Sequence, residues 1–561
     1  MKKLLYFTII TLFVVTSLLS GCSKKAEDDF QPSHDVKEEK DSVEAFATAA
    51  PQPAEGTTNQ YSKESEMSDE MLLEPPALYS SPIDDSEVYQ NEEYGEFIES
   101  KFNSPLENPL STFSIDVDTA SYSNIRRYLT DGYMPPEDAV RIEECINYFS
   151  YDYPQPEGRH PLDAYITIST CPWNEDRYLA RVAVQGEYIE KEDAGASNLV
   201  FLLDVSGSMS DQNKLPLVKS AMEMLSKELS EEDKISIVVY AGASGVVLQG
   251  ADGDDASKIQ RALDKLQAGG STAGGAGIEL AYEVAEEYFI KGGNNRVILC
   301  TDGDFNVGPS TTDELEKLIE KKRESGVFLS VLGFGTGNTK DNMMETLADK
   351  GNGNYAYIDN LMEAKKVLID DMTSTLYTIA KDVKIQIEFN PDAIKEYRLI
   401  GYDNRRLNDE DFNDDKKDAG EVGAGHSITV FYELILVGSE GSGTIDDLIF
   451  QNNDEKEDEG DAFEVEDWMY VKLRYKLPDE DESTLFTKMA GVDDFTKRPD
   501  EDFLFASAVT EFALLLKDSE YASDASYDSL IERAKDAKGD DDNGYRSQFI
   551  QLAELAATLD D

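Results

Sequence analysis

The sequence predicts an α/β protein in which a doubly wound, mostly parallel sheet is inserted into a β-sandwich, with a helical carboxy-terminal segment and a disordered amino-terminal tether. Three observations lead to this prediction. An apolar run without alternation, residues 199–203, is typical of a strand that is buried on both faces of a parallel sheet. Strand-like and helix-like segments alternate after it. On both sides of this region, runs that alternate apolar with polar residues indicate antiparallel sheets with one buried face.

The amino terminus is typical of a secretory signal. Met1-Lys-Lys precedes an apolar run, residues 4–19, that is short for a membrane-spanning helix. The run ends in Leu19-Ser-Gly-Cys22, which resembles a bacterial lipobox. The resemblance implies that residues 1–22 are a lipoprotein signal peptide and that Cys22 carries acyl chains such as palmitate. We therefore expect an extracytoplasmic lipoprotein, held at the cell envelope or cell surface by its lipid rather than by a helix; the alternative is an ordinary signal with an incidental cysteine.

Residues 23–108 are rich in Glu, Asp, Ser, Pro and Gln and have few apolar clusters, which predicts a disordered acidic linker. An accessory region is expected at residues 109–160, with a strand-like segment followed by helical segments at residues 125–129 and 135–149. Asp116 and Asp118 allow two interpretations, a second cation site or carboxylates that cap the following helix.

Six alternating runs predict the sandwich, namely residues 163–172, 178–188, 381–390, 395–402, 426–437 and 468–477. Two strands alone are not stable, so the runs before and after the central domain are expected to pair. The sandwich then consists of residues 161–195 and 379–480, with residues 196–378 inserted between them. Residues 481–561 form the carboxy-terminal helical region, with amphipathic segments at 503–516, 527–537 and 545–559.

Three oxygen-bearing side chains follow the buried run of the inserted domain. Asp204, Ser206 and Ser208 stand at every second residue, and Gly207 allows the backbone to turn tightly around what they face. A helical pattern begins at Leu215, so these oxygens lie at the carboxyl end of a strand, where open α/β sheets place their ligands. Hard oxygen donors around a tight turn indicate a divalent cation such as Mg²⁺.

Asp204-Val-Ser-Gly-Ser208 matches the DxSxS motif, and the inserted domain resembles the von Willebrand factor type A (VWA) domain, a Rossmann-like fold with a metal-ion-dependent adhesion site (MIDAS). Residues 269–278 resemble the second loop of that site, with Thr272 in the ligand position. Residues 297–304 resemble the third loop, with Asp302 in the ligand position. The resemblance therefore implies a metal site made of Asp204, Ser206, Ser208, Thr272 and Asp302.

The same resemblance implies that a Glu or Asp of a protein partner completes the shell of the metal. Mg²⁺ is the expected ion, although Mn²⁺ and Ca²⁺ accept the same oxygen ligands. Met209 and Asp304 are expected at the rim, in contact with the partner, and a helix cap or turn is an equal alternative for Asp304. With its flanking regions, the chain resembles bacterial VWA lipoproteins that have an accessory region before the domain and a domain of unassigned function after it.

The sequence thus predicts a divalent-cation-dependent module, tethered to the cell envelope, for adhesion or complex assembly. A formal charge of −62 excludes nucleic acid as a partner, because phosphates are bound by Lys and Arg. None of the three histidines belongs to a zinc-type pair and no serine nucleophile motif occurs, so we expect no enzyme. Two alternatives stay open: a metal-free structural or assembly protein, and a metal-dependent envelope hydrolase in which Asp304 is the base.

The acidic runs and the cysteines are further features of the sequence. Acidic runs at residues 409–415 and 454–459 are either weak calcium sites or solvated loops, and neither has the spacing of an EF-hand. Cys300 lies in a buried-strand run and is expected to be an inert thiol. Cys145 and Cys171 either form a disulfide or stay free, and the sequence does not fix their geometry.

Overall fold

The computed structural model describes residues 92–190, 195–242, 244–270, 274–303, 312–337, 339–439 and 462–560. The predicted signal peptide, Cys22 and the predicted linker up to residue 91 lie outside these ranges. In the described ranges, no helix combines the length and the apolar character needed to span a membrane.

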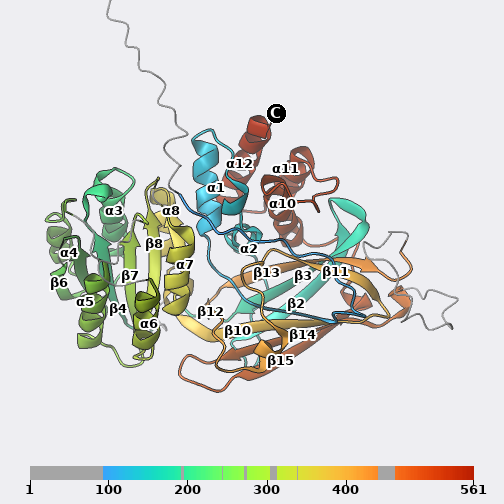
Figure 1. The fold of residues 1–561 in the computed structure, drawn as a ribbon, viewed down its shortest axis with the longest axis horizontal. Helices are drawn as coiled ribbons and strands as arrows, with labels where there is room; N and C mark the ends of the chain where they lie inside the picture. The colour runs from blue at the N-terminus through green and yellow to red at the C-terminus, as the bar shows by residue number, and fades with distance from the viewer. Residues whose placement is uncertain are drawn as a thin grey trace, which may run out of the picture. The chain divides into compact units, whose positions relative to one another are not determined.

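A six-stranded sheet forms the centre of the inserted domain (Figure 1). Its strand order is β6-β5-β4-β7-β8-β9, and every pair of neighbours is parallel except the edge strand β6, which runs antiparallel to β5. This confirms the predicted doubly wound, mostly parallel sheet. The strands are β4 (Ser197–Asp204), β5 (Lys234–Tyr240), β6 (Ser244–Asp252), β7 (Asn294–Thr301), β8 (Phe328–Phe334) and β9 (Tyr355–Ile358).

Helices cover both faces of this sheet, and the central strand β4 explains why its sequence does not alternate. Leu199, Phe201 and Leu203 pack into one apolar cluster with α3, α4 and the last helical segments of the domain. Val200 and Leu202 pack into a second cluster with α5, α6 and α7 on the opposite face. The helices are α3 (Leu215–Leu225), α4 (Ala256–Leu263), α5 (Gly274–Glu287), α6 (Thr312–Arg323), α7 (Asp341–Lys350), α8 (Leu361–Lys365), the π-helical η4 (Lys366–Asp370) and α9 (Met372–Leu376).

The predicted sandwich is present, with strands from both sides of the insertion. Its bounds were wrong, because β1 comes from the predicted accessory region and β15 from the segment predicted to be helical. One sheet has the order β11-β13-β3-β2, and the other has the order β1-β10-β14-β15 with β12 paired to β10. Apolar side chains of both sheets form one core. The strands are β1 (Leu110–Ser114), β2 (Leu162–Cys171), β3 (Asn174–Gly186), β10 (Thr378–Phe389), β11 (Ile394–Ile400), β12 (Gly420–Gly423), β13 (Ser427–Leu436), β14 (Asp467–Lys476) and β15 (Thr484–Gly491).

The two ends of the insertion lie side by side. The hydroxyl of Tyr377, which follows α9, donates to the carbonyl oxygen of Gly195 at 2.7 Å and lies 2.8 Å from Ser197 Oγ at the start of β4. A domain whose ends meet in this way can be inserted into a loop without disturbing the sheets around it.

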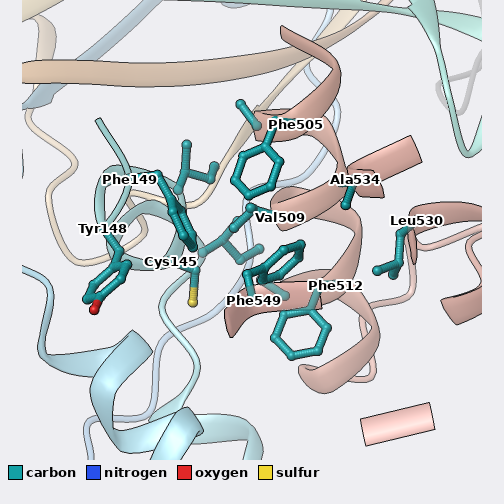
Figure 2. Packing of buried hydrophobic residues seen from close by; sticks show 14 of the residues in the cluster. Cys145, Tyr148, Phe149, Phe505, Val509, Phe512, Leu530, Ala534 and Phe549 are labelled. Carbon is teal, nitrogen blue, oxygen red and sulfur yellow. The ribbon is translucent and has the colours of Figure 1, made fainter. Parts of the chain in front are cut away.

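The accessory region and the carboxy-terminal helices share one apolar core (Figure 2). Phe149 makes edge-to-face contacts with Phe505 and Phe549, with ring centroids 5.1 and 5.7 Å apart. The two regions therefore fold together although about 340 residues separate them. The helices are α1 (Ala120–Thr130), the short 3₁₀ turn η2 (Glu137–Ala139), α2 (Ile142–Asn147), α10 (Glu501–Leu516), α11 (Tyr527–Asp536) and α12 (Tyr545–Asp560).

Cys145 and Cys171 are both buried near this core, and both thiols are free. The disulfide interpretation is therefore wrong: Cys145 of α2 and Cys171 of β2 belong to the same apolar core but are not bonded to each other. Cys300 is a buried free thiol in β7, as expected. Burial raises the pKa of all three thiols, which keeps them protonated and unreactive.

Asp116 and Asp118 follow neither of their two predicted interpretations. The side chain of Asp118 does not cap α1; it accepts the backbone N–H of Tyr355 at 2.8 Å. Arg405 occupies the position in which a second metal ion was envisaged, with Nε 3.0 Å from Asp116 Oδ2 and Nη2 3.3 Å from Asp118 Oδ2. The cation of this cluster is thus a guanidinium from the sandwich.

Residues 92–108 belong to the segment predicted as linker, and in the structure they contact the folded domains. Glu92 forms an ion pair with Arg127 at 2.8 Å and accepts the backbone N–H of Gly337. The backbone of Glu93 bonds to Thr339 and Asp341 of the inserted domain. The aromatic and acidic residues near position 94 therefore attach the start of the described chain to the VWA-like domain.

Candidate metal centre

The predicted ligands Asp204 and Asp302 lie at the same edge of the parallel sheet. Asp204 is the last residue of β4, and Asp302 follows the last residue of β7. The two strands are hydrogen-bonded neighbours, with Leu203 paired to Cys300, so their carboxyl ends meet. Both aspartates are buried, with 0 and 2% of their surface exposed.

The loop after β4 folds back over the end of the strand. Oδ1 of Asp204 accepts the backbone N–H of Ser206 at 2.7 Å, which fixes the carboxylate in the turn. The hydroxyls of Ser206 and Ser208 lie 2.9 Å apart. Ser206 is buried, whereas Gly207 is exposed and Ser208 is half-buried. The loop therefore places buried oxygens directly beside residues that solvent, or a partner, can reach.

Backbone hydrogen bonds bring the second predicted loop to the same place. The N–H of Gly207 donates to the carbonyl oxygen of Gly270, and the N–H of Gly269 donates to that of Val205, at 3.2 and 2.8 Å. Thr272 itself lies outside the described residues, as does Asp304 in the third loop. The structure therefore positions four of the five predicted ligands and the start of the loop that carries the fifth.

Met209 does not lie where it was predicted, at the rim of the site. Its side chain is completely buried in the apolar cluster under α3, next to Leu215 and Val218, so it does not lie at an exposed rim. The single-turn η3 (Gly207–Ser210) points it inward, because an apolar side chain between two polar ones packs against the core. It anchors the loop that holds the serines.

Sequence reasoning missed Lys214, the residue before α3. Its Nζ lies 2.9 Å from Asp302 Oδ2, and both side chains are buried. The aliphatic part of Lys214 crosses Gly335 so closely that a Cβ at that glycine would lie 2.2 Å from its Cε. In the sequence, Lys214 is a lone lysine ten residues after Asp204. Only the fold shows that its side chain contacts Asp302.

The charges at this edge suit a divalent ion. Burial raises the pKa of Asp204 to about 6, and the nearby carboxylate of Asp302 adds to the rise. Oδ2 of Asp204 is buried and has no partner at normal hydrogen-bond geometry within the described ranges, although the hydroxyl of Tyr240 lies near enough to the carboxylate to lower its pKa. An unsatisfied buried carboxylate oxygen is costly, and a cation bound there would satisfy it. Carboxylate and hydroxyl oxygens are the ligands that Mg²⁺, Mn²⁺ and Ca²⁺ prefer.

Comparison with protein families separates the inserted domain from the region that follows it. The profile of the "von Willebrand factor type A domain" matches residues 198–370. The profile "Uncharacterized protein YfbK, C-terminal" matches residues 374–559, and one described as "von Willebrand factor" matches residues 88–181. The inserted domain is thus a VWA domain, a class that commonly binds proteins through a metal at the MIDAS.

Individual proteins and solved structures are similar to this chain over different shares of its length. "Uncharacterized protein YfbK" of Escherichia coli K12 is 45% identical over 475 residues, which cover 83% of this chain and 81% of that protein. Among solved structures, the "von Willebrand factor type A" protein from Catenulispora acidiphila aligns with 70% of this chain and 90% of its own, at 16% identity and a TM-score of 0.39. A mussel byssus matrix protein with a "zinc occupied MIDAS motif" aligns with 32% of this chain and 45% of its own, at 24% identity and a TM-score of 0.27.

Proposed function

The chain belongs to the same family as YfbK of Escherichia coli, and on that premise we propose that it is a divalent-cation-dependent protein-binding module of the cell envelope. The observation that carries the proposal is the buried Oδ2 of Asp204, which has no partner at normal hydrogen-bond geometry within the described ranges. It lies at the edge of the sheet that also carries Asp302 and the paired hydroxyls of Ser206 and Ser208. In the proposed site, Asp204, Ser206, Ser208, Thr272 and Asp302 hold the ion.

The charge of the site supports a carboxylate as the partner's contribution. Asp204 and Asp302 supply two negative charges, Lys214 supplies one positive charge and the ion supplies two. The group keeps one net positive charge at a position that the exposed Gly207 leaves open. A Glu or Asp of a protein partner neutralises that charge and occupies the free coordination position. Mg²⁺ is the ion proposed, with Mn²⁺ and Ca²⁺ as substitutes.

We also propose that the protein is attached to a membrane. The segment of residues 1–22 resembles a lipoprotein signal, so we propose that Cys22 carries the lipid that holds the protein at the outer face of a membrane. Residues 23–91, with their acidic and polar composition, would then set the distance between the membrane and the VWA domain.

The proposed role is not catalytic. Of the two histidines that the structure describes, His160 lies 2.7 Å from the hydroxyl of Tyr475 and His426 accepts the backbone N–H of Gly423, so both belong to the sandwich. Burial lowers the pKa of His426 to about 4, which leaves it neutral at physiological pH. Neither imidazole is available as a base at Asp204 or Asp302.

A metal-free assembly surface is the second candidate, and the ion pair of Lys214 with Asp302 favours it. The ammonium group already neutralises one of the two carboxylates, so the edge of the sheet has a cation of its own. In that case the same surface binds its partner without metal.

Calorimetric titration of the purified protein with Mg²⁺ and Mn²⁺ separates the two candidates. We expect saturable binding of one ion, with a loss of at least about 100-fold in affinity for Asp204→Ala and Asp302→Ala, since each removes a charged ligand. Asp211→Ala, an exposed carboxylate close to the same loop, is the matched control and should bind as the wild type does. Absence of saturable binding to the wild type would contradict the metal-dependent proposal and support the metal-free surface.

A further inference from the structure

A cleft of about 930 Å³ lies between the VWA domain and the sandwich, and basic side chains dominate its lining. One wall consists of the last turns of α6 and α7, and the other is the segment of residues 404–419. Four carboxylates line it, Glu320, Glu324, Asp349 and Asp418. Twice as many cations do so, namely Lys317, Lys321, Arg323, Lys350, Arg405, Arg406, Lys416 and Lys417.

This excess of cations is unusual for the chain, which has 114 Asp and Glu against 52 Lys and Arg. With carboxylates so abundant, a lysine that has none beside it is unexpected. Lys317, Lys321 and Lys416 have no carboxylate within ion-pair distance among the described residues, and the nearest pairing of Lys417, to Asp411, is long at 3.8 Å. Lysines that form no ion pair within the described part of the chain and gather in one cleft indicate a place where an anion from outside can bind.

Ion pairs that cross the cleft hold its two walls in place. Arg323 of α6 pairs with Asp418 of the opposite segment at 2.9 Å and donates to Asn352. Arg405 pairs with Asp349 of α7 from the other side at 2.5 Å. These pairs neutralise part of the basic charge of the cleft. The exposed Lys317, Lys321 and Lys416 take no part in them and can bind a ligand.

The cleft is distinct from the candidate metal centre. The last turns of α6 and α7 lead into β8 and β9, so they lie at the amino ends of the parallel strands. Asp204 and Asp302 lie at the carboxyl ends, on the opposite edge of the sheet. A ligand in the cleft therefore does not contact the metal ligands.

We propose that this cleft binds a small soluble anion that carries several phosphate groups. Lysine ammonium groups serve as point charges for phosphate. The half-exposed guanidinium of Arg406 adds a further cation, although its Nη2 already donates to Ser100. The size of the ligand follows from the rest of the molecule. The formal charge of −62 repels a long polyanion or an anionic membrane over most of the surface, whereas a compact ligand experiences mainly the local field of the cleft.

Calorimetric titration with tripolyphosphate tests the proposal, in buffer from which divalent ions have been removed so that the metal centre takes no part. We expect saturable binding that becomes at least about tenfold weaker in the triple variant Lys317→Glu, Lys321→Glu, Lys416→Glu. These side chains are exposed, so the variant should fold, which circular dichroism checks. The matched control is Lys227→Glu, Lys258→Glu, Lys265→Glu, which changes the net charge equally at exposed sites on and after α3 and α4.

The control variant and Asp204→Asn should both bind tripolyphosphate within about twofold of the wild type. An equal loss in the control variant would show that only the overall charge matters and would overturn the proposal. So would an absence of saturable binding to the wild type. Binding to phosphatidylglycerol vesicles without binding to tripolyphosphate would also overturn it, because the ligand would then be a membrane rather than a compact anion.

Discussion

Two clusters of buried carboxylates in this molecule differ in the cation that each one has. At the junction of the VWA domain with the sandwich, oxygens of Asp116, Asp118 and Glu345 lie within 4.8 Å of one another, a spacing that would suit a metal ion. Arg405 forms ion pairs with all three and also with Asp349. At the carboxyl edge of the sheet, Lys214 contacts Asp302, while Oδ2 of Asp204 has no partner at normal hydrogen-bond geometry within the described ranges.

The comparison shows that spacing of carboxylates does not by itself identify a metal site. A guanidinium has five N–H donors in a planar arrangement and can satisfy several carboxylates at once. An ammonium group is a compact charge, and here it lies beside one of the two aspartates. The junction is therefore a structural ion cluster, and the edge of the sheet keeps an unsatisfied carboxylate oxygen for an ion.

Among the predictions, the largest change in free energy is expected when the guanidinium of Arg405 is removed from the junction. Arg405→Ala leaves several buried carboxylates without their cation, which should lower the free energy of unfolding by about 3–5 kcal/mol. Urea denaturation measures this difference. The matched control is Arg406→Ala, whose side chain is 47% exposed, and it should change the stability by less than about 0.5 kcal/mol. An equal effect of both substitutions would contradict the structural role of the junction.

A second prediction concerns pH at the contact of α2 with the sandwich, near Asp116. Burial raises the pKa of Glu143 to about 7, from an ordinary value of 4.5. Between pH 4.5 and about 7, Glu143 holds a proton in the folded chain and has released it in the unfolded chain. The free energy of unfolding therefore falls as the pH rises through this window. Glu143→Gln removes the proton dependence and still accepts the backbone N–H of Tyr402, which lies 2.9 Å from the carboxylate.

The variant should therefore be more stable than the wild type by about 1–3 kcal/mol near pH 8, and close to it near pH 5. Thermal unfolding at the two pH values measures the difference. Glu137→Gln, an exposed glutamate in the same region, is the control and should show no pH-dependent difference. A variant that is equally destabilised at both pH values would show that the charge of Glu143 is needed for packing.

The smallest effect is expected at Lys214. Lys214→Met removes a positive charge beside a metal ligand while keeping most of the aliphatic contact with Gly335. Mg²⁺ should then bind about tenfold more tightly, equivalent to about 1.4 kcal/mol, because the ion no longer competes with the ammonium for Asp302. Calorimetry measures the change, and the exposed Lys227→Met is the control. Weaker binding in Lys214→Met would mean that the lysine chiefly orients Asp302.

Much of the fold could be predicted because the patterns are local. The unalternating run of β4 has apolar partners on both faces, and the six alternating runs each have one face in the sandwich core. Three further strands of the sandwich were not assigned to it. β1 was placed in the accessory region, β12 has only 4 residues, and β15 lies within the segment predicted to be helical. Their pairing partners are distant in sequence, so pattern alone does not show them.

In the candidate metal centre, only the residues that belong to the family motif could be predicted. Its motif positions Asp204, Ser206, Ser208 and Asp302 at one edge, as the structure shows. The motif does not include Lys214, whose approach depends on how α3 packs. In the same way, Arg405 reaches Asp116 across 289 positions of sequence, and no local pattern predicts such a contact.

The most direct test of the difference between the two clusters is the number of Mn²⁺ ions bound per chain, counted by electron paramagnetic resonance of the free ion. The wild type should bind one ion tightly, Asp116→Asn should still bind one, and Asp204→Asn should bind none, because the unsatisfied oxygen lies at Asp204 and the junction is occupied by Arg405. Loss of the ion in Asp116→Asn together with its retention in Asp204→Asn would contradict this account.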